Sequence, residues 1–445
     1  MRQRDIFFFW LPLLASWLLM TTEGPFVSAT INRLPDETIM LAAQGIVISL
    51  SVFIEAPIIN MLATATALVK DRQAYDMVKR FTIHWMIILT IITALVGFVP
   101  PVFNLVIHVG LGIDETISQW VRPGMQIMLL WSAAIAWRRF LQGVLIQFKR
   151  TNFMAYGTAV RLAATIGAAA YVAYGTDLPG IYVGACGLMS GVIAEALFAT
   201  WATRPLFKKE LAPLTTEPEN PLTYQDLFWF HIPLAASSVL VLMLQPVITF
   251  ALARLDQPLL TLAAWPVIFQ LMLLARAPAL ALPEAVIALT TSPETYNPIR
   301  RFTFTLTILS ALAMLFFAIT PLSNFYIFGI QDMNDNVGTL ALNTIPYFIF
   351  FPALSILVFW IRGLLISQRA TRDVNLATAL NLGLTIICLA IGLLVQAPGL
   401  ITAAITLNLA TIGELIFLAY QVQKRLNYPI WSFRQYDLTQ NPSNS

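Results

Sequence analysis

The apolar stretch FFFWLPLLAS, residues 7–16, returns as FWFHIPLAAS at residues 228–237. The two copies are about 220 residues apart, and each carries a proline at the same place, Pro12 and Pro233. At a similar shift, Glu195 corresponds to Glu414 near the end of each half. Self-similarity at one fixed spacing predicts that the chain consists of two structurally equivalent halves.

The composition is that of a membrane protein. The 445 residues are 58% hydrophobic and 11% charged, with a mean hydropathy of +0.75, whereas soluble domains carry about 25% charged residues. Apolar stretches of about twenty residues recur along the chain, and each can cross about 30 Å of hydrocarbon as a helix. The net charge of +3 is ordinary when basic loops face the cytoplasm, so no nucleic-acid partner is predicted.

Apolar stretches between polar breaks predict an all-α integral membrane protein with twelve transmembrane helices. The predicted spans are approximately 6–31, 38–69, 80–109, 119–147, 154–175, 180–204, 224–252, 259–290, 300–328, 338–367, 373–396 and 399–424. Six helices in each repeat give both halves the same orientation. They therefore form two parallel six-helix bundles related by a pseudo-twofold axis along the membrane normal.

The predicted domains follow from these spans: an N-terminal bundle (1–206), a cytoplasmic linker (207–223), a C-terminal bundle (224–426) and a cytoplasmic tail (427–445). Basic residues concentrate in alternate loops, for example Lys149 with Arg150 and Arg300 with Arg301. The positive-inside rule then places both termini in the cytoplasm of a multi-pass protein of the cell membrane.

No catalytic, metal or cofactor site is predicted, so we do not expect an enzyme. Cys186 and Cys388 each lie inside an apolar span, and His84, His108 and His231 share no metal-ligand spacing. We expect these histidines near the membrane interfaces. No phosphate-binding loop of the GxxxxGK type occurs, so transport would be driven by a gradient, with H⁺ or Na⁺ as the coupling ion.

The turn after the first span of each half has a related sequence, NRLPDETIMLAA at 32–43 and ARLDQPLLTLAA at 253–264. With the two six-helix bundles, this pattern resembles the multidrug/oligosaccharidyl-lipid/polysaccharide (MOP) flippase superfamily, and within it the multidrug and toxic compound extrusion (MATE) family. The second half, above all IRRFTF at 299–304, is also similar to the progressive ankylosis family of pyrophosphate, nucleotide and organic-anion exporters. In the drug-extrusion branch an acid is expected near Val27; this chain has Glu23 one turn earlier, which leaves the coupling ion open.

The stretch VFIEAPIIN at 52–60 places Glu55 inside an apolar span, and the repeat places Arg276 of LARAPALAL (274–282) at the same depth. Charges inside a span are costly and usually face a cavity or a partner. The resemblance implies that both helices line a central cleft, so we expect the acid and the base to face one another. Two interpretations stay open: a structural ion pair, or a role in substrate binding or gating.

The repeat also places prolines inside four spans, where each frees a carbonyl one turn back and favours a kink: Pro25, Pro57, Pro246 and Pro278. Glu23, beside Pro25, is either a proton site or a hydrogen-bonded structural acid. Gln245, beside Pro246, either hydrogen-bonds a ligand or serves packing.

Other polar residues lie deep in their spans. Arg138 and Arg139 either snorkel toward the interface or form, with Arg276, a basic cavity suited to an anion. Glu195 is expected to pair with Arg161 within its bundle. Glu414, whose neighbour at the position of Arg161 is Asn381, would have a weaker partner and is therefore a candidate site acid.

These observations favour a secondary exporter or antiporter that moves a small organic solute by alternating access between two bundles. The alternatives are an ankylosis-type exporter of pyrophosphate or organic anions, and a flippase of lipid-linked precursors. The expected partners are a small-molecule substrate, with three deep arginines favouring an anion, and the lipid bilayer. The chain is expected to act as a monomer.

Overall fold

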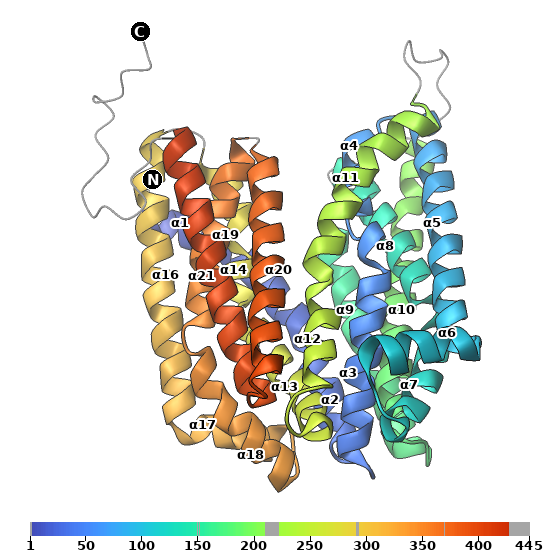
Figure 1. The fold of residues 1–445 in the computed structure, drawn as a ribbon. Coiled ribbons are helices and arrows are strands. Elements are labelled where there is room, and N and C mark those ends of the chain that lie inside the picture. Colours follow the sequence, from blue (N-terminus) through green and yellow to red (C-terminus); the bar gives the residue numbers. More distant parts are fainter. Residues whose placement is uncertain are drawn as a thin grey trace. The chain divides into compact units, whose positions relative to one another are not determined.

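The computed structural model describes residues 2–148, 150, 152–209, 222–290, 293–368 and 370–426. This part of the chain is made of helices and short connections and contains no β-strand (Figure 1). The predicted all-α class is confirmed. Most of the predicted linker (207–223), the predicted tail (427–445) and Lys149 lie outside the described residues.

The first half of the chain contains the helical elements that follow. They are α1 (Gln3–Thr21), α2 (Glu23–Ile31), α3 (Glu37–Ile54), η1 (Ala56–Ile58), α4 (Met61–Leu68), α5 (Arg72–Phe98), α6 (Pro100–Asn104), η2 (Leu105–Leu111), α7 (Glu115–Ile127), η3 (Met128–Leu130), α8 (Trp131–Gln147), α9 (Asn152–Gly175) and α10 (Gly180–Lys209).

The second half repeats this order with few differences. Its elements are α11 (Tyr224–Leu242), α12 (Leu244–Leu252), α13 (Pro258–Ala275), α14 (Ala277–Leu280), α15 (Leu282–Leu289), α16 (Pro293–Ile319), α17 (Pro321–Asn324), η4 (Phe325–Ile330), α18 (Asp335–Thr344), η5 (Ile345–Phe348), α19 (Phe351–Ser367), α20 (Thr371–Leu394) and α21 (Gly399–Leu426).

Ten helices in the described residues are long and apolar enough to cross a membrane, or eleven if the bent pair Asp335–Phe348 and Phe351–Ser367 is one span. The remaining predicted span, 119–147, corresponds to α7, η3 and α8 and is interrupted at η3. The helix count and the two-half organisation agree with the sequence prediction, because apolar length alone fixes where a span can lie.

Four spans are interrupted at the predicted prolines. The first span breaks before Pro25, between α1 and α2, and the seventh breaks before Pro246, between α11 and α12. The second and eighth break around Pro57 and Pro278, between α3 and α4 and between α13 and α15. A proline has no N–H to donate, so it is tolerated at the first turn of a new helix.

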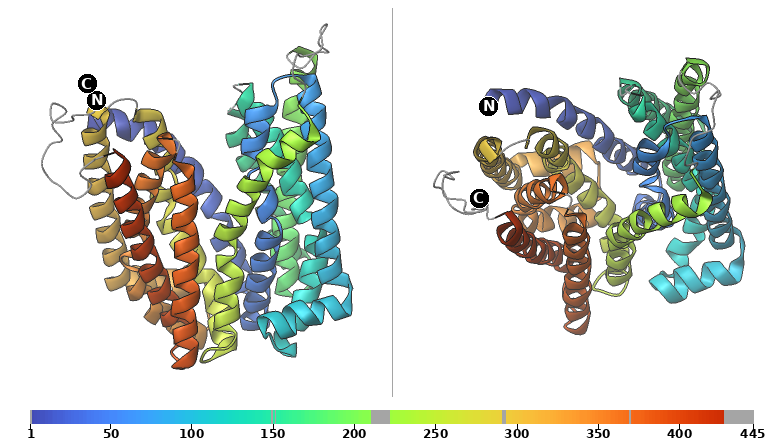
Figure 2. Two further views of the ribbon diagram at one scale, coloured as in Figure 1. Left: turned by 45° about the horizontal axis from the view of Figure 1, so that its top comes forward. Right: turned by 90° about the horizontal axis from the view of Figure 1, so that it is seen from above.

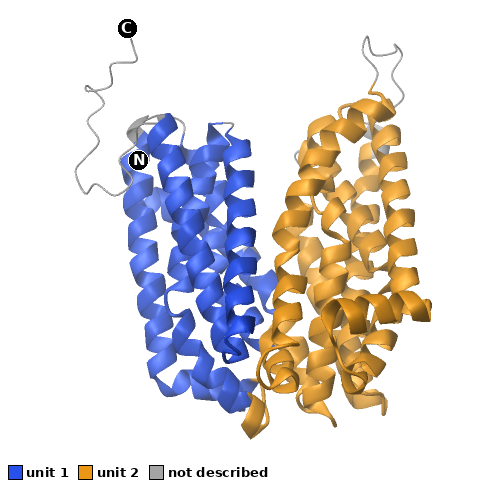
Figure 3. Cartoon of the chain, in the orientation of Figure 1, with its two compact units in different colours: residues 1–22, 267–330, 338–445 blue, residues 23–266, 331–337 orange. Residues whose placement is uncertain are grey.

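The chain forms two compact units (Figure 3). Unit 1 contains Met1–Thr22, Val267–Ile330 and Gly338–Ser445, and unit 2 contains Glu23–Pro266 and Gln331–Val337. The boundary between the units falls at the break of the first span, so α1 belongs to unit 1 and α2 belongs to unit 2. Helices α11 and α12 belong to unit 2, together with α2–α10. The units differ from the predicted bundles in the assignment of the first and seventh spans.

Unit 1 has one apolar core to which α1 contributes. Ile6 and Trp10 of α1 are buried in it with Leu282, Trp360 and Leu418 from the second half. α1 is inclined to the other helices of this unit (Figure 2). α1 is thus held by apolar contacts to α14, α15 and α16, although about 250 residues of chain separate it from them.

Candidate functional site

Unit 2 buries a cluster of six charged side chains inside its spans, which we call the unit 2 cluster. It consists of Glu23, Glu55, Arg138, Arg139, Arg161 and Glu195. Three acids face three bases, so the cluster is neutral when all are charged. Balanced charge is what a low-dielectric interior requires.

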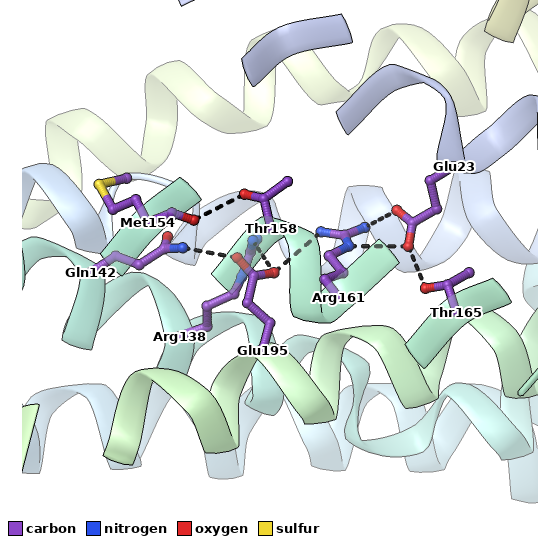
Figure 4. Close-up of polar contacts among 8 residues, drawn as sticks. All are labelled: Glu23, Arg138, Gln142, Met154, Thr158, Arg161, Thr165 and Glu195. Carbon is purple, nitrogen blue, oxygen red and sulfur yellow. Dashed lines mark hydrogen bonds and ion pairs between the residues drawn. The ribbon is translucent and has the colours of Figure 1, made fainter. Parts of the chain in front are cut away.

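Glu23 is held at the break of the first span. Its carboxylate accepts hydrogen bonds from Arg161 Nε at 3.1 Å and Arg161 Nη2 at 2.5 Å, and a third from Thr165 Oγ1 at 2.6 Å (Figure 4). A two-pronged arginine–carboxylate contact fixes geometry as well as charge. The sequence leaves two interpretations of Glu23 open, a proton site or a structural acid. These three hydrogen bonds join α2 to α9, as a structural acid would do.

Glu195 of α10 lies at the centre of the cluster. Its carboxylate accepts from Arg138 Nη1 at 2.7 Å and from Gln142 Nε2 at 3.0 Å (Figure 4). Arg161 Nη1 lies 3.8 Å from Glu195 Oε2, which confirms the expected pair, although Glu23 is the closer partner. Glu23, Arg161, Glu195 and Arg138 therefore form one chain of alternating charge.

Glu55 lies at the break between α3 and η1 and is buried. Arg138 and Arg139 act on its carboxylate electrostatically, and Trp131 lies beside it outside hydrogen-bonding geometry. Its Oε2 atom has no hydrogen-bond partner among the described residues. Glu55 is thus the acid of the cluster with spare capacity to bind a cation or a proton.

Unit 1 buries a smaller group, the unit 1 cluster, made of Arg276, Arg362 and Glu414. Glu414 of α21 forms an ion pair with Arg362 of α19 and accepts from Asn381 Nδ2 at 2.9 Å. Arg362 Nη2 also donates to Thr378 Oγ1 at 3.1 Å. The expectation that Glu414 has a weaker partner than Glu195 is wrong, because Arg362 supplies a charged partner in addition to Asn381.

Arg276 lies at the break between α13 and α14. Its guanidinium carbon lies 4.8 Å from the ring centre of Phe351 and 5.8 Å from that of Phe359. Arg362 and Glu414 both act on it electrostatically. Two bases therefore share one acid, and this cluster carries one excess positive charge when all three groups are charged.

Glu55 and Arg276, which the sequence pairs, belong to different units, and each has charged neighbours in its own unit. Arg138 and Arg139, expected in a basic cavity, lie in unit 2 with acids around them. Gln245 of α12 accepts a hydrogen bond from Trp265 Nε1 at 3.4 Å. No described group of three or more His, Cys, Asp or Glu residues could hold a metal ion.

Trp10 and His231 occupy equivalent places in the repeat, and the sequence prediction assigns neither of them to a helix break. The Trp10 Nε1–H donates to the carbonyl of Pro278 at 3.3 Å, and His231 Nε2 lies 2.9 Å from the carbonyl of Pro57. His231 is fully buried in the protein. In both halves, a ring nitrogen satisfies the proline carbonyl at the helix break.

The fold is known from solved structures. A multidrug resistance MATE family transporter of the MOP superfamily matches in its inward-facing conformation, with a TM-score of 0.72 and 13% identity over 92% of this chain and 95% of its own. A multidrug resistance MATE family transporter of the MOP superfamily in an outward-facing conformation matches with a TM-score of 0.65 and 14% identity, over 95% of this chain and 96% of its own. The lipid II flippase MurJ, in an inward closed conformation, matches with a TM-score of 0.74 and 14% identity over 93% and 87%.

No protein-family model matches the chain, and a search of curated proteins finds no significant match. The likeness to the progressive ankylosis family therefore stays a prediction. At these low identities the structural matches establish the arrangement of helices, which agrees with the predicted superfamily resemblance. The chain is a multi-pass membrane protein with the fold of MATE transporters and of the MurJ flippase.

Proposed function

We propose that the chain is a gradient-driven secondary transporter that moves a small organic solute by alternating access. The observation that carries this proposal is the pair of buried charge clusters at broken helices. Ionisable residues inside spans are costly and mark substrate or ion pathways, and broken helices at mid-membrane are where secondary transporters bind their cargo. The matched folds include inward-facing and outward-facing states of one transporter type.

Glu55 is our candidate for the coupling ion, H⁺ or Na⁺. The carboxylates of Glu23 and Glu195 each accept at least two hydrogen bonds from protein groups, whereas Glu55 Oε2 accepts none from the described residues. Protonating Glu55 would leave the unit 2 cluster with one excess positive charge. Such a change of charge is what a carrier needs if the ion is to alter the balance between its two states.

We propose an organic anion as the substrate, because the unit 1 cluster has more positive than negative charge. Arg276 lies between two aromatic rings and shares Glu414 with Arg362. An anionic group would compensate the excess charge and accept hydrogen bonds from a guanidinium. Arg138 contributes less to this proposal, since Glu195 already neutralises it.

A flippase of lipid-linked precursors is the second candidate. The MurJ lipid II flippase matches with a TM-score of 0.74, and a pyrophosphate-bearing lipid would present the same anionic chemistry to Arg276 and Arg362. Export of pyrophosphate or organic anions, as in the ankylosis family, would present a similar anionic group to these arginines, without the lipid. The flux experiment below separates these cargoes from the cationic drugs of multidrug extrusion.

The test is a flux screen in proteoliposomes under imposed H⁺ or Na⁺ gradients. Citrate, pyrophosphate, nucleotides, a fluorescent lipid-linked pyrophosphate and cationic dyes are compared. We expect anion flux that depends on one gradient. Arg276→Gln should lower it at least about tenfold, equal to 1.4 kcal/mol in the barrier, and Glu55→Gln should remove its dependence on the gradient.

Asp332→Asn is the matched control, since Asp332 is exposed in unit 2 and belongs to neither cluster. It should transport as the unaltered chain does. Transport of cationic dyes alone would contradict the anion proposal, and full flux in Arg276→Gln would exclude a direct role for Arg276.

We also propose that the chain acts as a monomer in the plasma or inner membrane, with both termini cytoplasmic. The alternation of basic loops supports this orientation. Cysteines introduced at Arg4 and at Arg80 should react with impermeant maleimide only from the cytoplasmic side. Labelling of either from outside intact cells would contradict it.

A further inference from the structure

A groove on unit 1, between α1 and α16, is separate from both charge clusters. Its volume is about 730 Å³, and its walls come from the first turns of α1 and from residues 300–309 of α16. Three arginines line it: Arg4, Arg300 and Arg301. No acidic residue is among the described residues that line it.

The groove has a charged end and an apolar end. Arg4, in the first turn of α1, and Arg301, two turns into α16, are exposed. Arg300 is buried with its guanidinium carbon 5.7 Å from the ring centre of Tyr296. Ile308 and Leu309, both more than half exposed, lie two turns further along α16, about 10 Å deeper. A basic rim above an apolar wall complements an anionic amphiphile.

A side-chain contact bridges the equivalent position in unit 2. Gln3 corresponds to Tyr224 and Thr305 corresponds to His84 at the repeat shift, and there the Tyr224 hydroxyl lies 2.8 Å from His84 Nδ1. Tyr224 also packs edge-on against Phe81 at 5.4 Å between ring centres. In unit 1, Gln3 instead donates to the carbonyl of Pro298 at 2.8 Å, and Thr305 lines the groove.

We infer that this groove binds an anionic phospholipid of the leaflet on the side of the N-terminus. The phosphate would lie against Arg4 and Arg301, and an acyl chain would run along Phe7, Ile308 and Leu309. The exposed charges of Arg4 and Arg301 favour an anionic headgroup, because a zwitterionic lipid would bring its own cation to a rim that already has two. The apolar wall favours a lipid over free phosphate, because it can bind an acyl chain and free phosphate has none.

The site also gives a reason for IRRFTF at 299–304. Two adjacent arginines on a helix point about 100° apart, so one can be buried while the next faces outward, as Arg300 and Arg301 do. A bound lipid at this place would cover the contact of α1 with α16. This inference does not depend on the transported substrate.

Native mass spectrometry of the purified full chain tests the inference. Dioleoyl phosphatidylglycerol, dioleoyl phosphatidylcholine and inorganic phosphate are the probes. We expect phosphatidylglycerol to be retained over phosphatidylcholine, and inorganic phosphate at millimolar concentration not to displace it. The double variant Arg4→Gln, Arg301→Gln should weaken retention about fivefold for each arginine removed, while Arg80→Gln, the equivalent of Arg301 in unit 2, should not change it.

A second variant tests the apolar part of the groove and does not alter its charge. Thr305→Trp fills the groove and should also reduce retention, with all three arginines present. Equal losses in Arg80→Gln and Arg301→Gln would overturn the inference, because a general surface charge would then explain binding. Displacement by inorganic phosphate, or unchanged retention in Thr305→Trp, would show that no acyl chain is held and would overturn it as well.

Discussion

Unit 2 and unit 1 bury a glutamate at the same place in the repeat, and the partners of the two glutamates are exchanged. Glu195 contacts Arg138 and Gln142, with Arg161 nearby. Glu414 contacts Arg362, which stands at the position of Gln142, and Asn381, which stands at the position of Arg161. The repeat thus keeps a hydrogen-bonded acid at this place. Its hydrogen-bonding arginine stays on the equivalent helix, as Arg138 on α8 and Arg362 on α19, but one helical turn further along the chain in unit 1.

The two clusters also differ in net charge. The unit 2 cluster has three acids and three bases, and the unit 1 cluster has one acid and two bases. A balanced cluster can be stable without a ligand, because each charge has a partner. An unbalanced one gains more from an incoming anion. We therefore propose different tasks for the two units: ion coupling in unit 2 and anion binding in unit 1.

The largest effect expected on stability is that of Glu195→Gln. This variant leaves Arg138 and Arg161 with one fewer acid in a site where Glu195 is 1% exposed, and removing one member of a buried pair costs about 3–5 kcal/mol. Glu414→Gln should cost less, about 1.5–3 kcal/mol, since Arg362 keeps Thr378 and the ring of Phe359. Unfolding in mixed micelles with increasing SDS measures both.

Equal losses for the two variants would show that the number of arginines around the acid does not matter. A larger loss for Glu414→Gln would reverse the comparison. Glu195→Gln combined with Arg138→Met should recover part of the loss, because a buried charge without a partner is then removed.

The sequence predicts where the spans lie and all four breaks, because apolar length and proline chemistry are local properties. Its span ends are less accurate: the third span is Arg72–Phe98 rather than 80–109, and the ninth is Thr295–Ile319 rather than 300–328. It also predicts that Arg161 and Glu195 are close, from their depth. It misses that Glu23 is the nearer partner of Arg161, since the face that a residue presents depends on helix rotation and packing. Depth along the membrane was predictable, and direction around the helix was not.

For some contacts that the sequence analysis does not predict, the alignment of the two halves already contained an indication. Arg362 directly precedes Gly363, and Gln142 directly precedes the equivalent Gly143, so the alignment already placed a polar residue there in both halves. His231 aligns with Trp10, and an apolar ring at that place indicates that both rings are buried in the protein. The grouping of α1 with unit 1 had no such signal, because it rests on side-chain packing between distant segments.

The repeated glycines provide a second test of the comparison. A Cβ on Gly143 of α8 would lie 2.4 Å from the carbonyl oxygen of Leu62, whereas one on Gly363 of α19 would lie 2.9 Å from the Cβ of Val286. We expect Gly143→Ala to cost about 2–3 kcal/mol and Gly363→Ala about 1 kcal/mol, within the range for overpacking. SDS unfolding followed by circular dichroism measures both, and the reverse order would contradict the closer approach in unit 2.

The ring nitrogens of His231 and Trp10, which contact the proline carbonyls, provide a third test of the comparison. His231→Phe removes the donor to Pro57 and the contact of Nδ1 with Thr64 Oγ1 at 2.9 Å, and it should cost about 1–2 kcal/mol. Trp10→Phe removes only the longer bond to Pro278 and should cost about 0.5–1 kcal/mol beyond the lost ring area. Thr64→Val should cost less than His231→Phe, because it leaves the bond to Pro57 in place.

The smallest effect is expected at the exposed pair of Arg33 and Asp332, which are 3.7 Å apart with side chains 37% and 58% exposed. Asp332→Asn should change the unfolding free energy by about 0.5 kcal/mol or less, since water and salt screen such a pair.

Arg33 also donates to the carbonyl of Ala29 at the end of α2, and Arg254 donates to the carbonyl of Phe250 at the equivalent place after α12. Arg33→Met should therefore cost more than Asp332→Asn, because it removes a cation from a helix C-terminus. Equal losses of unfolding free energy in Asp332→Asn and Glu195→Gln would contradict this comparison, because burial would then not explain why the charge clusters contribute more than the surface pairs.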